Sequence, residues 1–291
     1  AWERARPLPP GERARALLAV AEPSCPRGEL AGWTVGRRHA ALLAWRGALF
    51  GPSLTTLTDC PSCGEAVEAT VAVADLVLDA RPAADAATSP AATGEVTVEG
   101  YTVGFRAPTA GDLAALAREV PTTAPDGAAE AWLLERCVLR ATGPGGPCEA
   151  ADLPEAVVAE LVASVAAVDP GADVALAVGC PACATEWAAR LDVVGFLSQE
   201  LDAWAARLVG EVHALARAYG WTEPDVLALE LAWEALQTGN IGVGAVVTDP
   251  SGAVVATGRN RVLDPEAPPG QVAGSSLAHA EVNALAQLRF R

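Results

Sequence analysis

The sequence predicts an α+β protein: a helical body that carries a four-cysteine metal ribbon and a β-hairpin, followed by a short α/β segment. Three observations lead to this fold class. Two Cys-Pro-x-Cys pairs stand at residues 60–63 and 180–183. Apolar residues alternate with polar ones over 67–73 and 96–105, which is typical of half-buried strands. Over much of the remaining chain, apolar residues recur every three or four positions, as they do in amphipathic helices.

The cysteine pairs, Cys60 with Cys63 and Cys180 with Cys183, are the strongest chemical signal in the chain. Cys-Pro-x-Cys forms a tight turn that directs two sulfurs at one point, and a tetrahedral Zn²⁺ site needs two such turns. We therefore expect one structural zinc site, closed to substrates because four thiolates fill it. A disulfide or four unrelated thiols are the alternatives. Residues 64–179 lie between the pairs, so the metal would join distant parts of the chain.

The composition indicates a folded, acidic protein. Hydrophobic residues make up 51% of the chain, which is ample for a packed core. The formal net charge of −16 argues against general nucleic-acid binding and against an anionic membrane as partner, but leaves basic proteins open. No apolar run reaches the length of a membrane span, and the N-terminus does not resemble a signal peptide. We therefore expect a cytoplasmic location, which also suits zinc thiolates.

Lysine and methionine are both absent, so all 20 basic residues are arginine. The lack of lysine excludes Schiff-base catalysis, a phosphate-binding-loop lysine and a Ser-Lys dyad. Because an initiator methionine is also missing, we expect the chain as given to be incomplete at its start. Other reactive side chains show no pattern: we expect ordinary packing or surface roles for Cys25, Cys137, Cys148, His39 and His213.

The periodicity of the first part predicts the following elements in chain order. Short helices come first, including one over Gly36–Phe50 with Leu42, Trp45 and Leu49 on one face. After them we expect a strand over Val67–Val73, a linker or exposed loop over Ala80–Gly94, and a hairpin that turns at Glu99-Gly100 between Val96 and Phe105. Three helices follow, one from a Thr109–Asp112 capping box to about Val120, then Ala128–Arg140 and Pro154–Val168, and finally a strand over Val174–Val178.

A long amphipathic helix follows the second cysteine pair, with an apolar stripe from Leu197 to Leu215 that either covers the domain's own core or docks a partner. A compositional boundary lies near residue 226, because all three asparagines and the only isoleucine lie beyond it. Two domains are therefore expected, 1–225 and 226–291. The second should contain a helix over Leu229–Leu236 and strands over Asn240–Val247 and Val254–Asn260.

Residues from about 10 to 225 resemble the baseplate (hub assembly) family of contractile tails, found in T-even-type phages and related phage-tail-like injection particles. The matching segments are 60–64, 71–76, 106–113, 180–192, and, most specifically, 200–204 continuing to 213–221. The resemblance implies a non-enzymatic structural or assembly role at a tail baseplate. It also implies that the partners are other proteins of such a particle.

Residues from about 226 to 291 are similar to the N-terminal half of a cytidine or deoxycytidylate-type zinc deaminase. The matching features are the two strands, the Gly-Arg-Asn-Arg turn and the His279-Ala280-Glu281 motif. In that chemistry the histidine binds Zn²⁺ and the glutamate shuttles protons to the ring of the base. By this resemblance His279 is the metal ligand, Glu281 the proton shuttle, and Asn260 a contact to the sugar or base of a nucleoside or nucleotide.

The same chemistry also requires a later Pro-Cys-x-x-Cys, which supplies the other two metal ligands. None of the ten residues after Glu281 is cysteine, and Cys180 and Cys183 have the order Cys-Pro-x-Cys instead. The deaminase segment is thus truncated, and we expect no deaminase activity from residues 1–291 alone. Two functions follow, a zinc-stapled assembly protein or a zinc-dependent hydrolytic deaminase. A gene fusion, a frameshift product or a fragment of a longer protein is a third possibility.

Overall fold

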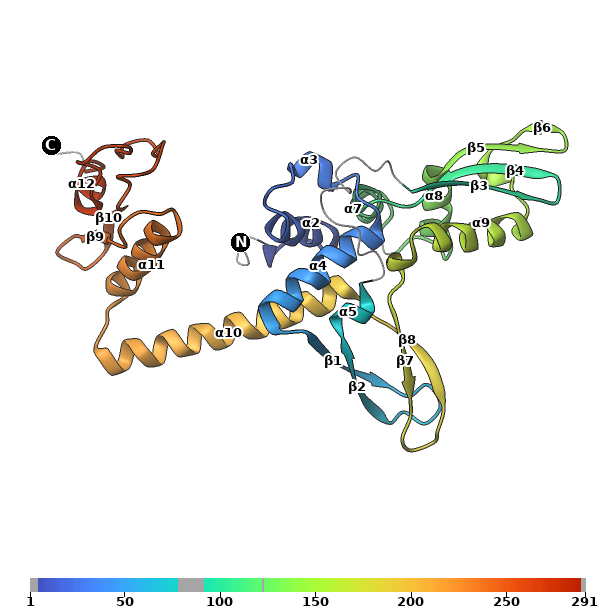
Figure 1. Ribbon diagram of the computed structural model, residues 1–291, viewed down its shortest axis with the longest axis horizontal. Helices are drawn as coiled ribbons and strands as arrows, with labels where there is room; N and C mark the ends of the chain where they lie inside the picture. The colour runs from blue at the N-terminus through green and yellow to red at the C-terminus, as the bar shows by residue number, and fades with distance from the viewer. Residues whose placement is uncertain (1–4, 78–91, 122, 289–291) are drawn as a thin grey trace. The chain divides into compact units, whose positions relative to one another are not determined.

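The structure, a computed structural model, describes residues 5–77, 92–121 and 123–288 (Figure 1). The chain folds into two compact units, Ala1–Asp202 (unit 1) and Ala203–Arg291 (unit 2). The division falls inside helix α10 (Val193–Tyr219), upstream of the compositional boundary near residue 226. Helices and small antiparallel sheets occur throughout, which confirms the α+β class.

Unit 1 begins with helices and then alternates hairpins with helices. Its elements up to residue 77 are α2 (Pro10–Ala21), α3 (Arg27–Leu30), α4 (Val35–Phe50), β1 (Ser53–Asp59), β2 (Ala66–Ala72) and α5 (Val73–Leu76). Those from residue 92 onward are β3 (Thr93–Val98), β4 (Tyr101–Arg106), α7 (Ala110–Glu119), α8 (Ala128–Cys137), β5 (Val138–Gly143), β6 (Gly146–Pro147), η1 (Ala150–Asp152), α9 (Glu155–Val168), η2 (Pro170–Ala172), β7 (Ala175–Gly179) and β8 (Glu186–Arg190).

The first hydrophobic core of unit 1 is formed by residues from the first and the last part of its sequence. It packs α2, α4 and the β1–β2 hairpin against the β7–β8 hairpin and the start of α10, with Leu18, Leu42, Leu54 and Leu197 almost fully buried. A two-pronged ion pair spans the same elements, because the Arg46 guanidinium donates to both carboxylate oxygens of Glu200 at 2.6 and 2.9 Å. The residues on either side of the intervening segment therefore form one folded body.

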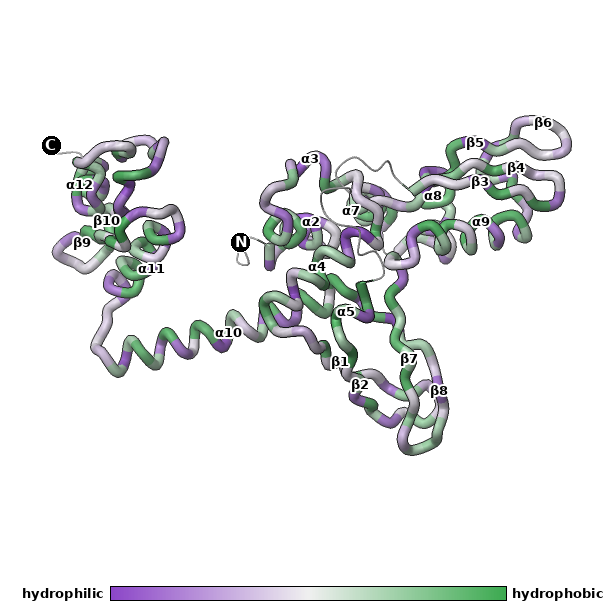
Figure 2. The backbone as a smooth tube through the Cα atoms, in the orientation of Figure 1, coloured by the Kyte–Doolittle hydropathy of each residue, from purple (hydrophilic) through white to green (hydrophobic). Residues whose placement is uncertain are grey.

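The intervening segment has a second core of its own. Strands β3, β4, β5 and β6 form an antiparallel sheet in that order, and α9 packs on it through Val157 and Leu161. Figure 2 shows that α9 is largely hydrophobic along its length. The β3–β4 turn places Glu99 and Gly100 at φ of 50° and 78°, the left-handed pair that a two-residue type I′ hairpin turn requires.

The C-terminal part of unit 2 is a two-stranded antiparallel sheet with a helix on each face. Its elements are α11 (Glu223–Gln237), β9 (Gly244–Thr248), β10 (Val254–Arg259) and α12 (Ala280–Leu285). A Cβ on Gly244 would meet α11 at Ala228, whereas a Cβ on Gly258 would meet α12 at Ala280. Gly258 pairs with Ala245, the neighbour of Gly244, so the two helices cover opposite faces.

Several predicted boundaries are wrong. The helix predicted over Ala128–Arg140 ends at Cys137, because Val138 starts strand β5 beside β4. Val73 begins helix α5 instead of ending a strand, and Gly94, predicted as loop, lies in β3, while residues 80–91 fall outside the described part. The strand predicted from Asn240 begins only at Gly244. Leu49, predicted on the packed face of α4, is 46% exposed.

The long helix α10 is present, and hydrophobic and hydrophilic residues alternate along it (Figure 2). Its stripe covers the core only at the N-terminal end, where Leu197 and Leu201 are buried, whereas Leu208 and Leu215 are exposed. Within the described residues, no helix combines the length and the apolar character needed to cross a membrane.

Candidate metal centre

The two cysteine pairs lie at the tips of two hairpins, β1–β2 and β7–β8, which the fold brings side by side (Figure 1). Each hairpin has an unbroken antiparallel register up to its turn, from Ser53↔Ala72 to Asp59↔Ala66 and from Ala175↔Arg190 to Gly179↔Glu186. The strands therefore hold each turn rigidly, as a site built for fixed coordination geometry requires.

Both turns have the same backbone design. The N–H of Cys60 donates to the carbonyl of Glu65 at 2.8 Å, and the N–H of Cys180 donates to that of Thr185 at 2.9 Å. A second bond closes each turn, from Gly64 to Cys60 and from Ala184 to Cys180, both at 2.9 Å. The residue that follows the second cysteine of each turn has a positive φ, 74° at Gly64 and 58° at Ala184.

The four sulfurs converge on one point. The Sγ atoms of Cys60, Cys63, Cys180 and Cys183 all lie within 4.8 Å of one another, and the pairs Cys60–Cys183 and Cys63–Cys180 are 3.6 Å apart. A tetrahedral site with metal–sulfur bonds of about 2.3 Å has edges of about 3.8 Å, whereas a disulfide needs about 2.05 Å. The four cysteines are not joined by disulfides, and their arrangement could hold one metal ion.

The cluster has a buried side and an exposed side. Cys60 and Cys180 belong to the first hydrophobic core of unit 1, while Cys63 and Cys183 are exposed. Hydrogen bonding with the side chain and backbone of Thr185, together with smaller contributions from the neighbouring thiols, lowers the pKa of Cys183 to about 6. At Cys63 a backbone bond from Glu65 lowers the pKa, but contacts with Cys183 and Cys180 raise it to about 12. A metal ion bound here would displace the protons of the thiols.

The two hairpins and the helices that follow them repeat each other at a constant distance in the sequence. An offset of 120 residues relates Cys60 to Cys180. The same offset relates buried Leu54 to Val174 at the hairpin bases, and Val73 to Val193 at the helix starts. Our sequence reasoning missed β1 and β8, and this offset between matching apolar positions is the signal that could have found them.

The residues predicted for a second metal site lie in unit 2. His279 is the N-cap residue of α12 and Glu281 stands in its first turn, and both are exposed. The N–H of Arg261 donates to the carbonyl of Ala278 at 2.8 Å. Arg261 follows Asn260 and Ala278 precedes His279, so this bond joins the two segments that carry the predicted site residues. In the described part of the chain, the cysteine cluster is the one group of three or more metal-ligating residues, so His279 belongs to no such group.

Asn260 is 2% exposed, and its Oδ1 accepts a hydrogen bond from the N–H of Val262 at 3.1 Å. Its position supports the loop that leaves β10, and contact with a substrate stays a prediction. The other two asparagines act in the same way. Asn240 accepts from the N–H of Leu263 at 2.7 Å, and Asn283 accepts from that of Val272 at 2.6 Å.

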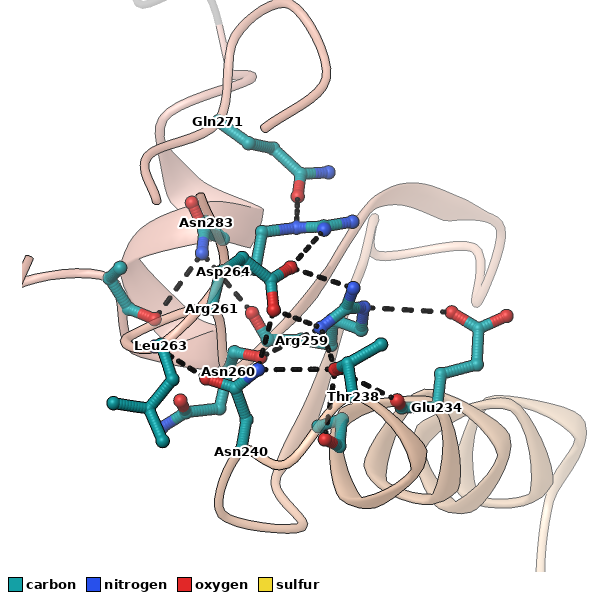
Figure 3. Close-up of polar contacts among 12 residues, drawn as sticks. Glu234, Thr238, Asn240, Arg259, Asn260, Arg261, Leu263, Asp264, Gln271 and Asn283 are labelled. Carbon is teal, nitrogen blue, oxygen red and sulfur yellow. Dashed lines mark hydrogen bonds and ion pairs between the residues drawn. The ribbon is translucent and has the colours of Figure 1, made fainter. Parts of the chain in front are cut away.

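A buried ionic network connects these asparagines, and our sequence reasoning missed it (Figure 3). Asp264 accepts from Arg259 and Arg261, both at 2.8 Å, and from the amide of Asn240 at 2.5 Å. Burial raises the pKa of Asp264, but these bonds, led by that from Arg259, lower it more. The gathering of all three asparagines beyond residue 226 was the available signal, since buried loop backbone needs polar side chains as partners.

Comparison with models of known protein families, with curated proteins and with solved structures found no match.

Proposed function

We propose that the cysteine cluster binds a structural Zn²⁺ ion and that the chain is a structural or assembly protein. The observation that supports this proposal is the convergence of four sulfurs from two hairpins that are far apart in the sequence. Four thiolates complete the tetrahedral coordination of zinc, so a substrate would find no open position on the ion. The metal would act as a staple that closes the first core of unit 1.

We further propose that this stapled body works in the baseplate of a contractile phage-tail-like particle. The support is the resemblance of residues 10–225 to baseplate proteins, above all the segments 200–204 and 213–221. Its partners would be other components of the particle. An acidic chain with net charge −16 would bind basic protein surfaces in preference to nucleic acid.

The metal assignment is tested by elemental analysis of the purified chain. We expect one zinc per chain, lost in the double variant Cys60→Ser/Cys180→Ser and retained in the control Cys148→Ser, because Cys148 is a half-buried thiol outside the cluster. One iron in place of zinc would contradict the choice of metal, since tetrahedral thiolate sites also suit iron. Retention of metal by the double variant would contradict the site itself.

The assembly role is tested by producing the chain together with the other proteins of a contractile particle. We expect the tagged chain to co-purify with the particle or with an assembly intermediate, and the double serine variant to be lost from it. Intact, contractile particles formed in the absence of the chain would contradict the role.

A deaminase function is the second candidate, and the observation that favours it is the arrangement of unit 2. Asn260 directly follows β10, its neighbour Arg261 is hydrogen-bonded to Ala278 just before α12, and the start of α12 presents His279 and Glu281 to solvent. One imidazole alone does not complete a catalytic zinc site, so we expect no turnover of cytidine or deoxycytidine. Turnover that is abolished by Glu281→Gln, together with a second zinc lost in His279→Ala, would establish this function instead.

A further inference from the structure

The four sulfurs of the cysteine cluster differ in their access to solvent. Cys60 and Cys180 are 3% and 4% exposed and belong to the first core, whereas Cys63 and Cys183 are exposed. The residues next to both exposed cysteines are exposed as well, over 61–65 in one turn and 181–184 in the other. A small oxidant dissolved in water can therefore reach one sulfur of each hairpin, while the other sulfur is shielded.

Two sulfur–sulfur contacts join the hairpins to each other. The Sγ of Cys60 lies 3.6 Å from that of Cys183, and the Sγ of Cys63 lies 3.6 Å from that of Cys180. Each contact combines the buried sulfur of one hairpin with the exposed sulfur of the other. An S–S bond is about 2.05 Å long, so each pair has to close by about 1.5 Å. Because one sulfur of each pair is exposed, it can move this far without displacing a core side chain.

This arrangement matches the oxidation chemistry of thiols. Cysteines that react with peroxide are accessible thiolates with a second, resolving cysteine beside them. Sulfurs that bind a metal ion are deprotonated, so the exposed sulfurs of a loaded cluster are thiolates. Each exposed sulfur has a buried partner 3.6 Å away, on the opposite hairpin, that can act as the resolving thiol.

We propose, on the basis of the metal-binding function above, that peroxide converts the cluster into two disulfides between the hairpins, Cys60–Cys183 and Cys63–Cys180. The exposed cysteines are the sites of oxidation, and the buried ones are the resolving residues. The two hairpins thus stay joined after the metal is lost. A metal ion holds them together in reducing surroundings, and disulfides do so in oxidising ones.

Each disulfide forms in two steps. The exposed thiolate attacks one oxygen of hydrogen peroxide, the O–O bond breaks, and the sulfur becomes a sulfenic acid while hydroxide leaves. The buried thiolate then attacks this sulfur, the S–S bond forms, the S–O bond breaks, and a second hydroxide leaves. Two protons from the solvent convert both hydroxides to water. One pair of thiolates thus loses two electrons, and one peroxide molecule gains them.

The pairing decides whether oxidation preserves the link between the hairpins. The two proposed disulfides join residues that are 123 and 117 positions apart. A disulfide that closes so long a loop strongly restricts the unfolded chain, whereas one inside a Cys-x-x-Cys turn closes a loop of only a few residues and restricts it little. Oxidation within the turns would therefore leave the hairpins unconnected.

Peptide mapping without reduction tests the pairing. Trypsin cuts after arginine but not before proline, so it places the first cysteine pair in residues 47–106 and the second in residues 141–190. The zinc-loaded full chain with Cys148→Ser, which removes the other thiol of the second peptide, is treated with hydrogen peroxide. We expect the loss of four thiols, zinc release measured with a colorimetric chelator, and a covalent link between the two peptides.

Three results of this experiment would overturn the proposal. The first is a disulfide within each turn, which leaves the peptides separate and each lighter by two hydrogens. The second is sulfinic acid at Cys63 and Cys183 with no link between the peptides. The third is a cluster that keeps its thiols and its zinc in peroxide. The variant Cys25→Ser, altered outside the cluster, should behave like its parent.

Thermal unfolding measures the consequence for unit 1. We expect the oxidised chain to unfold about 10 °C above the reduced chain from which zinc has been removed by a chelator. An oxidised chain that unfolds at the same temperature or lower would overturn the proposal. A chain purified without zinc whose peptides still link would contradict the metal assignment and support the pairing. A zinc-loaded chain that forms disulfides within its turns would do the reverse.

Discussion

At the scale of single residues, the two cysteine turns differ most clearly at one position. Gly64 and Ala184 occupy the same place in the two turns, and both have positive φ. Glycine adopts this conformation freely, but the Cβ of alanine clashes with the backbone there, at a cost of about 1–2 kcal/mol. The second turn therefore stores strain that the first lacks.

Replacing Ala184 with glycine should stabilise unit 1. The relief of strain is partly offset by the greater freedom of glycine in the unfolded chain, so we expect a gain of about 0.5–1 kcal/mol in urea unfolding of the metal-loaded protein. The reciprocal control, Gly64→Ala, should lose about 1 kcal/mol. Equal stability of Ala184→Gly and wild type would show that the turn relaxes without strain.

The buried His39 makes unit 1 sensitive to acid. Burial and, to a smaller extent, the adjacent Arg38 guanidinium lower the pKa of His39 to about 4, while its Nδ1 lies 3.1 Å from the carbonyl oxygen of Gly171. In the unfolded chain His39 takes up a proton near pH 6.5, whereas in the folded chain its side chain stays neutral down to about pH 4. Stability that is fully present above pH 6.5 is therefore lost as the pH falls toward 4.

We expect unit 1 to lose up to about 3 kcal/mol of unfolding free energy between pH 6.5 and 4 because of this histidine. The measurement is urea unfolding across that range in wild type and in His39→Gln, which cannot be protonated. The pH slope of the variant should be shallower in this window. Parallel slopes would assign the acid sensitivity to the carboxylates instead.

At the scale of elements, two helices begin with the same capping box in different surroundings. Thr109 and Asp112 start α7, and Thr222 and Asp225 start α11. Asp112 is 4% exposed and also accepts from Arg106 at 2.6 and 3.0 Å, whereas Asp225 is exposed. Burial raises the pKa of Asp112, but its bonds from Arg106 and Thr109 lower it more, so it is ionised throughout the physiological range.

The variant Asp112→Ala should therefore cost more than Asp225→Ala. Removing an exposed cap costs about 1 kcal/mol, but removing Asp112 also leaves a half-buried Arg106 without its carboxylate, and we expect about 3 kcal/mol. Thermal unfolding followed by circular dichroism measures both. Similar losses in the two variants would mean that the bond to Arg106 contributes little.

At the scale of the whole molecule, the cysteine cluster lies where the two hairpins of the first core meet, and the segment between these hairpins in the sequence has a core of its own. Cys60 and Cys180 belong to the first core, and the sheet β3-β4-β5-β6 with α9 forms the second. A structural zinc site contributes folding free energy directly, because the unfolded chain holds no preformed site. The two cores should respond differently to metal loss.

Removing the metal with a chelator should loosen the first core and spare the second. We expect the hydrogen-exchange rate of the backbone amides to rise in residues 53–72 and 175–190 and to stay low in residues 101–106 and 138–143. Cys60→Ser should reproduce this pattern, and Cys25→Ser, which alters a half-buried thiol outside the cluster, should not. Uniform loss of protection would mean that the second core depends on the first.

Local patterns in the chain were enough to predict the four cysteines of the cluster, the Thr109 cap and the Glu99-Gly100 hairpin, because each depends on residues a few positions apart. They did not predict where the helix after Ala128 ends, since β5 forms by pairing with β4, which is remote in sequence. Neither did they predict the burial of Asn260, which depends on the loop packed over it.

A Cys-Pro-x-Cys turn directs its two thiols through local geometry alone, so the residue pattern was enough to show which side chains offer sulfur atoms for a cluster. It took the tertiary structure to show that both turns meet at one point and that the second half of the α10 stripe is exposed. Each of these depends on how distant segments pack together, and local periodicity shows that a surface is apolar without showing what covers it.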